Sequence, residues 1–334
     1  MNEIVPAILS IEGLSVRLPA GADRTHALSD VSLSVASNEI LCVVGESGSG
    51  KSMMANAVLR LLPNEVAIDG GRMVFEGRDL AAASEADMRS LRGADIAMIF
   101  QEPMTALNPL RTIGDQIAEV FSVHTDLSRA EIASKVLALL ADVRIPDPKV
   151  AAKAYPHELS GGQRQRAMIA MALALDPKLL IADEPTTALD VTIQAQILAL
   201  ILDLQKELGT GLVLITHDLG VVAQTAQRVI VMYAGKKVEE ADVDSLFANP
   251  RHPYTRGLMA SIPTLPTRGA KASPRLAEIP GTVPSLVRLP PGCAFAPRCP
   301  LAVERCRAEY PPLEKFGANH FAACWRAAEM AAAS

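Results

Sequence analysis

The stretch that decides the fold is Gly45-Glu46-Ser47-Gly48-Ser49-Gly50-Lys51-Ser52. It follows the apolar residues 40–44, which predict a buried strand, and it precedes residues 53–62, a run without Gly or Pro that predicts a helix. The glycines allow the backbone to turn so that successive N–H groups point toward one ligand. The N-terminus of the following helix adds its partial positive charge at the same place, so the stretch predicts an anion site.

A strand, a glycine loop, Lys-Ser and a helix form the P-loop arrangement. In that arrangement the amides hold phosphate oxygens, Lys51 reaches the β- and γ-phosphates, and the Ser52 hydroxyl ligates Mg²⁺. A glycine-rich turn without a ligand is the alternative, but the complete spacing and its flanking elements favour a nucleoside triphosphate site. All residues of the loop are therefore candidate ATP ligands.

Composition limits the class of protein. The chain has 334 residues, 49% of them apolar, and a formal net charge of -5, which predicts one large domain with an appendage and disfavours nucleic acid as the main partner. No apolar run approaches the roughly 20 residues that span a bilayer, and the N-terminus lacks the features of a signal peptide. We expect a cytosolic chain that contacts a membrane only through another protein, and five cysteines that do not form disulfides.

The order of predicted elements indicates an α/β fold. Short alternating strands are expected within residues 8–44, and later strands at 72–76, 96–100, 179–182, 212–216 and 229–233. Strands that alternate with helices predict a parallel sheet with crossovers. Residues 112–176 predict a helical subdomain, and the frequent prolines after residue 248 predict a loop-rich appendage. The predicted division is 1–248 and 249–334.

Further motifs carry chemistry. Ser160-Gly161-Gly162-Gln163 opens a predicted helix and offers N–H groups and a hydroxyl to an anion, although alone it indicates no more than a capped helix. Residues 179–182 lead into Asp183 and Glu184, whose side chains point to opposite sides of a strand and so can have separate roles. Asp183 can help to bind Mg²⁺, and Glu184 can accept a proton from water. The alternative interpretation is an Asp-Glu pair at the start of a helix.

In this order the motifs resemble the nucleotide-binding subunit of an ABC transporter. The P-loop, Gln101, the Leu-Ser-Gly-Gly-Gln signature at 159–163, Asp183-Glu184, Asp190 and His217 each fall where that family has them. The resemblance implies a P-loop NTPase ABC cassette: a mixed sheet with an antiparallel β part, a helical subdomain and the appendage. It also implies a head-to-tail pair of cassettes with ATP between them.

The resemblance also implies roles for these residues. Gly45, Glu46, Ser47, Gly48, Ser49, Gly50, Lys51 and Ser52 would hold the nucleotide, and Ser52, Gln101 and Asp183 would serve Mg²⁺. Glu184 would be the catalytic base, His217 would contact the γ-phosphate, and Gln101 would couple the site to the membrane subunit. Ser160, Gly161, Gly162 and Gln163 would close on ATP in the partner's site, with Asp190 at the dimer seam. One departure is Leu18, which stands where the family has an adenine-stacking aromatic residue; His26 lies nearby.

The appendage narrows the resemblance. Residues 249–255, Ile279-Pro280-Gly281 and residues 292–299 closely resemble the dipeptide/oligopeptide/nickel importer ATPases, most of all the dipeptide-importer ATPase that pairs with a second, non-identical one. This implies an ATP-coupled translocase subunit that energises peptide import at the cytoplasmic face of the inner membrane. Its implied partners are two permease subunits and a periplasmic peptide-binding protein, without nucleic acid. The alternatives are nickel, glutathione or opine cargo, and a soluble ABC ATPase acting on nucleic acid or ribosomes.

Four cysteines of the appendage form a set of their own: Cys293, Cys299, Cys306 and Cys324. A Pro- and Gly-rich segment with a small core often needs a metal, and four thiolates suit Zn²⁺ or an iron–sulfur cluster. The intervals are wider than those of most zinc sites, so reduced, partly buried thiols are the alternative. Some members of the importer group carry a [4Fe–4S] cluster at corresponding cysteines, and the resemblance therefore favours that cofactor. Cys42 is expected to be a packing residue.

Overall fold

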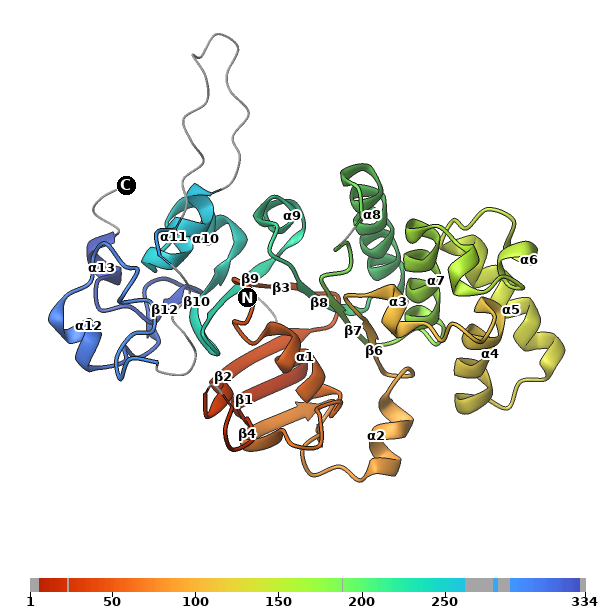
Figure 1. Cartoon of the computed structure of the whole chain (residues 1–334), viewed down its shortest axis with the longest axis horizontal. Coiled ribbons are helices and arrows are strands. Elements are labelled where there is room, and N and C mark those ends of the chain that lie inside the picture. The colour runs from red at the N-terminus through yellow and green to blue at the C-terminus, as the bar shows by residue number, and fades with distance from the viewer. Residues whose placement is uncertain (1–5, 23, 188, 262–278, 282–288, 331–334) are drawn as a thin grey trace, which may run out of the picture.

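Two sheets form the centre of the molecule (Figure 1). The computed structural model describes residues 6–22, 24–187, 189–261, 279–281 and 289–330. The smaller sheet is antiparallel and has the order β2-β1-β4-β5. Its strands are β1 (Ala7–Arg17), β2 (His26–Ala36), β4 (Ala67–Phe75) and β5 (Arg78–Asp79). Alternate residues of β1 and β2 are buried, as the polar–apolar alternation predicts.

The larger sheet is mixed and has the order β11-β12-β10-β9-β3-β8-β7-β6. Its strands are β3 (Ile40–Val44), β6 (Ile96–Ile99), β7 (Leu179–Asp183), β8 (Gly211–Ile215), β9 (Arg228–Tyr233), β10 (Lys236–Asp242), β11 (Glu314–Lys315) and β12 (Phe321–Ala322). Neighbours from β9 through β6 are parallel, and nearly all their residues are buried, as continuous apolar runs require. The predicted mixed α/β fold is confirmed.

Helices pack around this sheet, and a further group of helices lies to one side of it. Those near the sheet are α1 (Lys51–Val58), α2 (Glu85–Leu91), α7 (Gly161–Leu173), α8 (Val191–Leu208), α9 (Leu219–Thr225) and α10 (Val243–Ala248). The helix after the P-loop is shorter than the predicted run to residue 62. It stops because Arg60 adopts a left-handed conformation, with φ of 51°, directly after the last turn. Among the described residues, none of the helices is both long and apolar enough to cross a bilayer.

The region predicted to be a helical subdomain, 112–176, contains α4 (Ile113–His124), α5 (Arg129–Asp142), α6 (Pro148–Ala151), the 3₁₀ helix η1 (Pro156–Glu158) and α7, at the right of Figure 1, and the short helix α3 (Pro103–Ala106) precedes it. Thr112 caps α4 by accepting from the amide of Asp115, and Ser128 caps α5 in a capping box. The buried faces of these helices, including Phe121 and Leu140, pack in the same apolar core as the larger sheet. The insertion is therefore firmly joined to that sheet.

The appendage contains α11 (Pro253–Ala260), α12 (Glu304–Ala308), β11, β12 and α13 (Ala327–Met330). It is poor in regular structure, as its prolines predict, but it also extends the larger sheet, because β12 pairs antiparallel with β10 (Figure 1). Beneath this pairing, the fully buried carboxylate of Glu239 accepts from the amides of Arg251 and His252, at 2.6 and 3.0 Å, and lies 2.7 Å from Nε2 of His320. The carboxylate of Glu239, on β10, thus binds both the beginning of the appendage, at Arg251 and His252, and a residue near its end, His320.

We expect Glu239→Ala to lower the free energy of unfolding by about 3 kcal/mol, because it leaves two amides and an imidazole buried without their acceptor. Urea unfolding followed by circular dichroism measures the change. Glu309→Ala is the matched control, since Glu309 forms an exposed pair with Arg305 and its loss is worth under about 1 kcal/mol. Equal effects of the two substitutions would contradict the anchoring role of Glu239.

Candidate active site

The P-loop connects β3 to α1 and is pressed against the neighbouring strands. Gly45 has φ of 153° and Gly50 has φ of 102°, conformations that favour glycine. A Cβ at Gly45 would lie 2.2 Å from the carbonyl oxygen of Met232, and one at Gly50 would lie 2.6 Å from a methyl carbon of Leu28. The glycines are thus required by the close approach of β9 and β2 as well as by the shape of the loop.

Lys51 lies inside the loop with 5% of its surface exposed. Its Nζ donates to the carbonyl oxygens of Gly45 at 2.8 Å and Glu46 at 3.1 Å. Burial lowers the pKa of Lys51, while the carboxylates of Glu184, Asp183 and Glu46 act in the opposite direction. A cation is therefore held at the centre of the phosphate-binding loop, close to the acidic pair that ends β7.

Asp183 and Ser52 lie together at this centre. The side chain of Asp183 is hydrogen-bonded to Ser52, and burial raises the pKa of its carboxyl group while that hydrogen bond lowers it. Its Oδ1 is buried without a hydrogen-bond partner. Mg²⁺ binds through carboxylate and hydroxyl oxygens, so an unpartnered carboxylate oxygen beside the Ser52 hydroxyl fits this ion. The structure brings these two predicted Mg²⁺ residues into contact.

Glu184 gathers side chains from neighbouring strands. It has φ of 45°, a left-handed turn directly after β7, and its Oε2 accepts from Nε2 of Gln101 at 3.1 Å and Oγ1 of Thr187 at 3.0 Å. Nδ1 of His217 lies 3.4 Å from the same oxygen. Gln101 follows β6 and His217 follows β8, the two neighbours of β7 in the sheet. The three residues predicted to be catalytic thus meet at one oxygen.

Thr187 is a member of this cluster that the motifs did not single out. Its hydroxyl donates to Glu184 from three residues further along the chain. The available signal was a hydroxyl residue within one turn of the predicted base. Arg24 was also missed: its Nη1 donates to the carbonyl oxygen of Gly48 at 3.3 Å, which brings the loop before β2 to the P-loop.

The signature residues 160–163 lie at the start of α7, apart from the P-loop. Ser160 caps α7 by accepting from the amide of Gln163, and Asp190 caps α8 by accepting from the amide of Ile193. A Cβ at Gly162 would lie 3.0 Å from Ile193, so the starts of α7 and α8 are in contact. No hydrogen bond between described residues joins 160–163 to the P-loop, and α7 stands apart from α1 in Figure 1. One chain therefore presents the phosphate loop and the signature as two separate surfaces.

Leu18 stands at the position where the ABC family has an aromatic residue that stacks on adenine. Leu18 is half-buried and packs against the core of the smaller sheet. Nε2 of His26 lies 3.0 Å from Oδ2 of Asp69, so this ring is already engaged by a carboxylate. The structure gives the Leu18 side chain a packing role and does not place an aromatic ring there.

Comparison with known proteins identifies two family matches. The ABC transporter family matches residues 28–187, and the C-terminal region of the oligopeptide/dipeptide transporter family matches residues 238–306. The first match spans the P-loop, the signature and the acidic pair. The second begins within β10 and ends at Cys306, so it includes three of the four appendage cysteines.

Full-length relatives agree with these matches. A probable peptide ABC transporter ATP-binding protein of Sinorhizobium fredii is 55% identical over 330 residues, 98% of each chain. The dipeptide transport ATP-binding protein DppD of Escherichia coli is 47% identical over 318 residues, covering 95% of this chain and 96% of its own. The ATP-binding cassette MJ0796, solved as a dimer in a post-hydrolysis state with ADP and Pi, has a TM-score of 0.63 and 27% identity, covering 70% of this chain and 98% of its own.

Fold, site and relatives together define an ABC transporter ATPase, and the chain belongs to that family. Such an enzyme binds ATP with Mg²⁺ and hydrolyses it, which agrees with the fit of Lys51, Ser52 and Asp183. Its branch is that of the peptide transporter ATP-binding proteins, since both the C-terminal family match and the relatives that cover nearly the whole chain belong there.

We expect Asp183→Asn to raise the free energy of unfolding of the nucleotide-free chain by about 1 kcal/mol at pH 7.5. Burial places the folded-state pKa of Asp183 above its ordinary value, so stability present at low pH is lost as pH rises through the folded pKa. The substitution removes this charge, and thermal and urea unfolding measure the gain. Asp190→Asn is the control, because Asn caps a helix as well as Asp does. A loss of stability in Asp183→Asn would refute the argument from burial.

Proposed function

We propose that this chain is an ATPase subunit of an importer of di- or oligopeptides and works at the cytoplasmic face of the inner membrane. Relatives that align along almost the entire chain are named for peptide or dipeptide import, which supports this class of cargo. Nickel, glutathione and opine remain alternative cargoes, because the residues of the ATP site do not discriminate among transported molecules.

The observation that carries the mechanism is the meeting of Gln101, Glu184 and His217 near Lys51. The side-chain hydrogen bonds of residues 160–163, in the described part of the chain, are capping bonds of α7 and do not reach the P-loop. A chain that separates its phosphate loop from its signature can complete the site with a second cassette. Val191, next to Asp190, is 81% exposed, an apolar side chain available for such a contact. We assign the partner cassette to a second, homologous but non-identical subunit, whose signature closes on ATP here.

Within the closed site, each residue has a role that follows from its contacts. The loop amides and Lys51 hold the phosphates, and Mg²⁺ bound at Ser52 and Asp183, with Gln101 nearby, would neutralise phosphate charge. Oε2 of Glu184 accepts the proton of the attacking water, and Gln101, Thr187 and His217 fix its position. Because phosphoryl transfer depends mainly on positioning and charge, closure by the partner controls hydrolysis.

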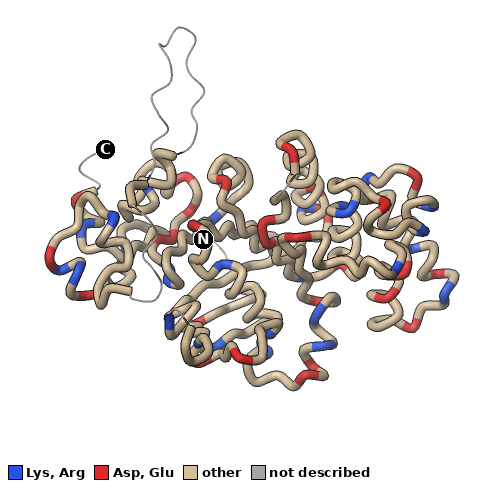
Figure 2. Tube along the Cα trace, in the orientation of Figure 1, with Lys and Arg blue, Asp and Glu red and all other residues tan. Residues whose placement is uncertain are grey.

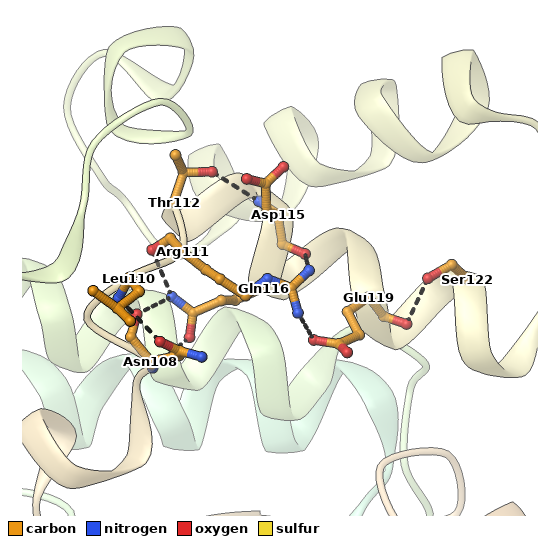
Figure 3. Close-up of polar contacts among 8 residues, drawn as sticks. All are labelled: Asn108, Leu110, Arg111, Thr112, Asp115, Gln116, Glu119 and Ser122. Carbon is orange, nitrogen blue, oxygen red and sulfur yellow. Dashed lines mark hydrogen bonds and ion pairs between the residues drawn. The ribbon is translucent and has the colours of Figure 1, made fainter.

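The segment after Gln101 supports a contact with the permease subunits. Figure 3 shows how the loop before α4 is fixed: the side-chain amide of Gln116 donates to the carbonyl oxygens of Asn108 and Arg111 and accepts from the amide of Asn108. The loop holds Leu110 with 85% of its surface exposed. Beside it, α4, α5 and α6 enclose a groove of about 850 Å³. A rigid loop with an exposed apolar residue beside a groove suits a protruding segment of a permease.

Nucleic acid is disfavoured as a partner. In Figure 2 basic and acidic residues are interspersed along the described chain, without the long basic stripe that a phosphate backbone requires. The net charge of -5 agrees with this distribution. The partners we propose are therefore proteins: the second ATPase, two permease subunits and a periplasmic peptide-binding protein.

We expect Glu184→Gln to reduce ATP turnover at least 100-fold, because the amide cannot take up the proton of the attacking water. With MgATP it should hold the two cassettes closed. Phosphate release by the assembled transporter and size-exclusion chromatography with light scattering measure the two effects. Glu207→Gln, at an exposed position of α8, provides the control. Unchanged turnover in Glu184→Gln would remove Glu184 from the role of base.

The four appendage cysteines support a cofactor proposal. Cys293, Cys299, Cys306 and Cys324 line one cavity. Burial raises the pKa of Cys293 to about 11 and that of Cys324 to about 12, and nearby thiols add to both shifts, so thiolates here need a compensating cation. In the described part of the chain, no three His, Cys, Asp or Glu side chains lie close enough to hold one metal ion.

A [4Fe–4S] cluster fits this arrangement better than a single zinc ion, because each thiolate ligates a different iron and the sulfurs need not converge on one atom. We propose that the cluster has a structural role. Anaerobically purified chain should contain about four iron and four sulfide per chain. Cys299→Ser should reduce both, whereas Cys42→Ala should not, since Cys42 is buried in β3 away from the set. Metal-free protein, or zinc alone, would reject the cluster.

A further inference from the structure

The second residue of the P-loop, Glu46, is held by residues of the appendage. Its amide donates to the hydroxyl oxygen of Tyr254, on α11, at 2.8 Å. Its carboxylate receives both branches of the Arg298 guanidinium: Nη1 donates to Oε2 at 2.7 Å and Nη2 to Oε1 at 3.1 Å. Its carbonyl oxygen accepts from Nζ of Lys51 and from the amide of Ser49. Glu46 thus connects the appendage directly to the loop lysine.

Arg298 is fixed as completely as an arginine can be. It is 8% exposed, and its remaining N–H groups donate to the carbonyl oxygens of Pro280 and Ile279 and to the hydroxyl of Tyr233, at 3.2, 3.3 and 3.4 Å. With the two bonds to Glu46, each of its five N–H donors has an acceptor. Because all five N–H groups of the planar guanidinium are engaged, its position is fixed, and so is the position of the Glu46 carboxylate that it binds.

Three aromatic rings fix the surroundings of this pair. Tyr233 at the end of β9, Tyr254 on α11 and Phe295 in the appendage lie with ring centroids 4.6 to 5.4 Å apart. Both tyrosines are fully or almost fully buried, and Phe295 is 2% exposed. This packing holds the end of the larger sheet, α11 and the Arg298 loop as one unit. Arg298 is joined to this aromatic cluster through the hydroxyl of Tyr233 and lies over the ring of Phe295, with its Cζ 5.9 Å from the ring centroid.

The charge of Glu46 is the reason that this contact bears on ATP. The P-loop binds a polyanion, and a carboxylate within the loop opposes that binding unless a cation neutralises it. The hydrogen bond that Lys51 donates to Glu46 goes to the carbonyl oxygen of Glu46, while the carboxylate of Glu46 is hydrogen-bonded by Arg298. Arg298, which stands 252 residues away in sequence, is the cation on the carboxylate itself.

We propose that Arg298 is a positioning residue of the nucleotide site, which neutralises Glu46 and fixes the first turn of the P-loop from the appendage. ATP affinity then depends on a residue outside the cassette motifs. The competing explanation is that the ion pair merely attaches the appendage to the cassette. The two explanations differ because only the first ties ATP affinity to the charge of Glu46.

The decisive experiment compares Arg298→Met with the double substitution Glu46→Gln/Arg298→Met in the full-length chain. Calorimetry with a non-hydrolysable ATP analogue and Mg²⁺ gives the dissociation constant. We expect the dissociation constant to rise about tenfold in Arg298→Met, because one partner of a partly buried charge pair is lost. In the double variant the dissociation constant should return most of the way to the parental value. In the assembled transporter, KM for ATP should rise about tenfold while kcat changes less than about twofold.

Two further variants keep the experiment decisive. Arg305→Met removes an arginine from an exposed ion pair of the same appendage and should leave the affinity unchanged. Arg298→Lys keeps the charge without the fork, and its dissociation constant should lie between those of the parent and Arg298→Met. If Arg298→Met does not fold, Arg298→Lys alone and combined with Glu46→Gln provides the same comparison. Parental affinity in the Arg298 variants, or no recovery when Glu46 loses its charge, would overturn the proposal.

Discussion

Parallel pairing of β6, β7 and β8 is the constraint on which the active site depends. Asp183, the last residue of β7, pairs with Ile215, the last residue of β8, so the residues that follow each strand begin side by side. The amide of Glu184 continues this pairing by donating to the carbonyl oxygen of Ile215 at 2.9 Å. From this position its side chain reaches Gln101 on one side and His217 on the other. A shift in this register would separate the groups that meet at one carboxylate oxygen.

The features that could be predicted from sequence are those that local spacing specifies. Continuous apolar runs identified the buried strands, and glycine spacing before Lys51 identified the P-loop. The shared site of Gln101, Glu184 and His217 was predicted from the resemblance to a family, and parallel strands that end at a common edge explain why the three residues meet. The signature was recognised through its resemblance to a family, and its separation from the P-loop within one chain is in keeping with the head-to-tail pair that the resemblance implies.

The features that escaped prediction depend on contacts between distant segments. Glu239 reads as one acidic residue among several in β10, yet it is fully buried under the appendage because Arg251, His252 and His320 converge on it. The left-handed turn at Glu184 also has no sequence signal, since a glutamate rarely adopts that conformation. Hydrogen bonds and packing around the residue impose it. Local periodicity contains no information about such partners.

The appendage shows why a change in composition need not mark a change in packing. Prolines become frequent after residue 248, but β12 completes the sheet at β10, Phe295 packs in the cassette core, and Arg298 reaches the P-loop. Arg298 also lies between Cys293 and Cys299 in the sequence, two of the four cysteines that line one cavity of the appendage. The loop that carries Arg298 is thus connected to the phosphate loop through the ion pair between Arg298 and Glu46. A cassette cut at residue 248 would retain every motif of an ABC ATPase and still leave an uncompensated carboxylate in its P-loop.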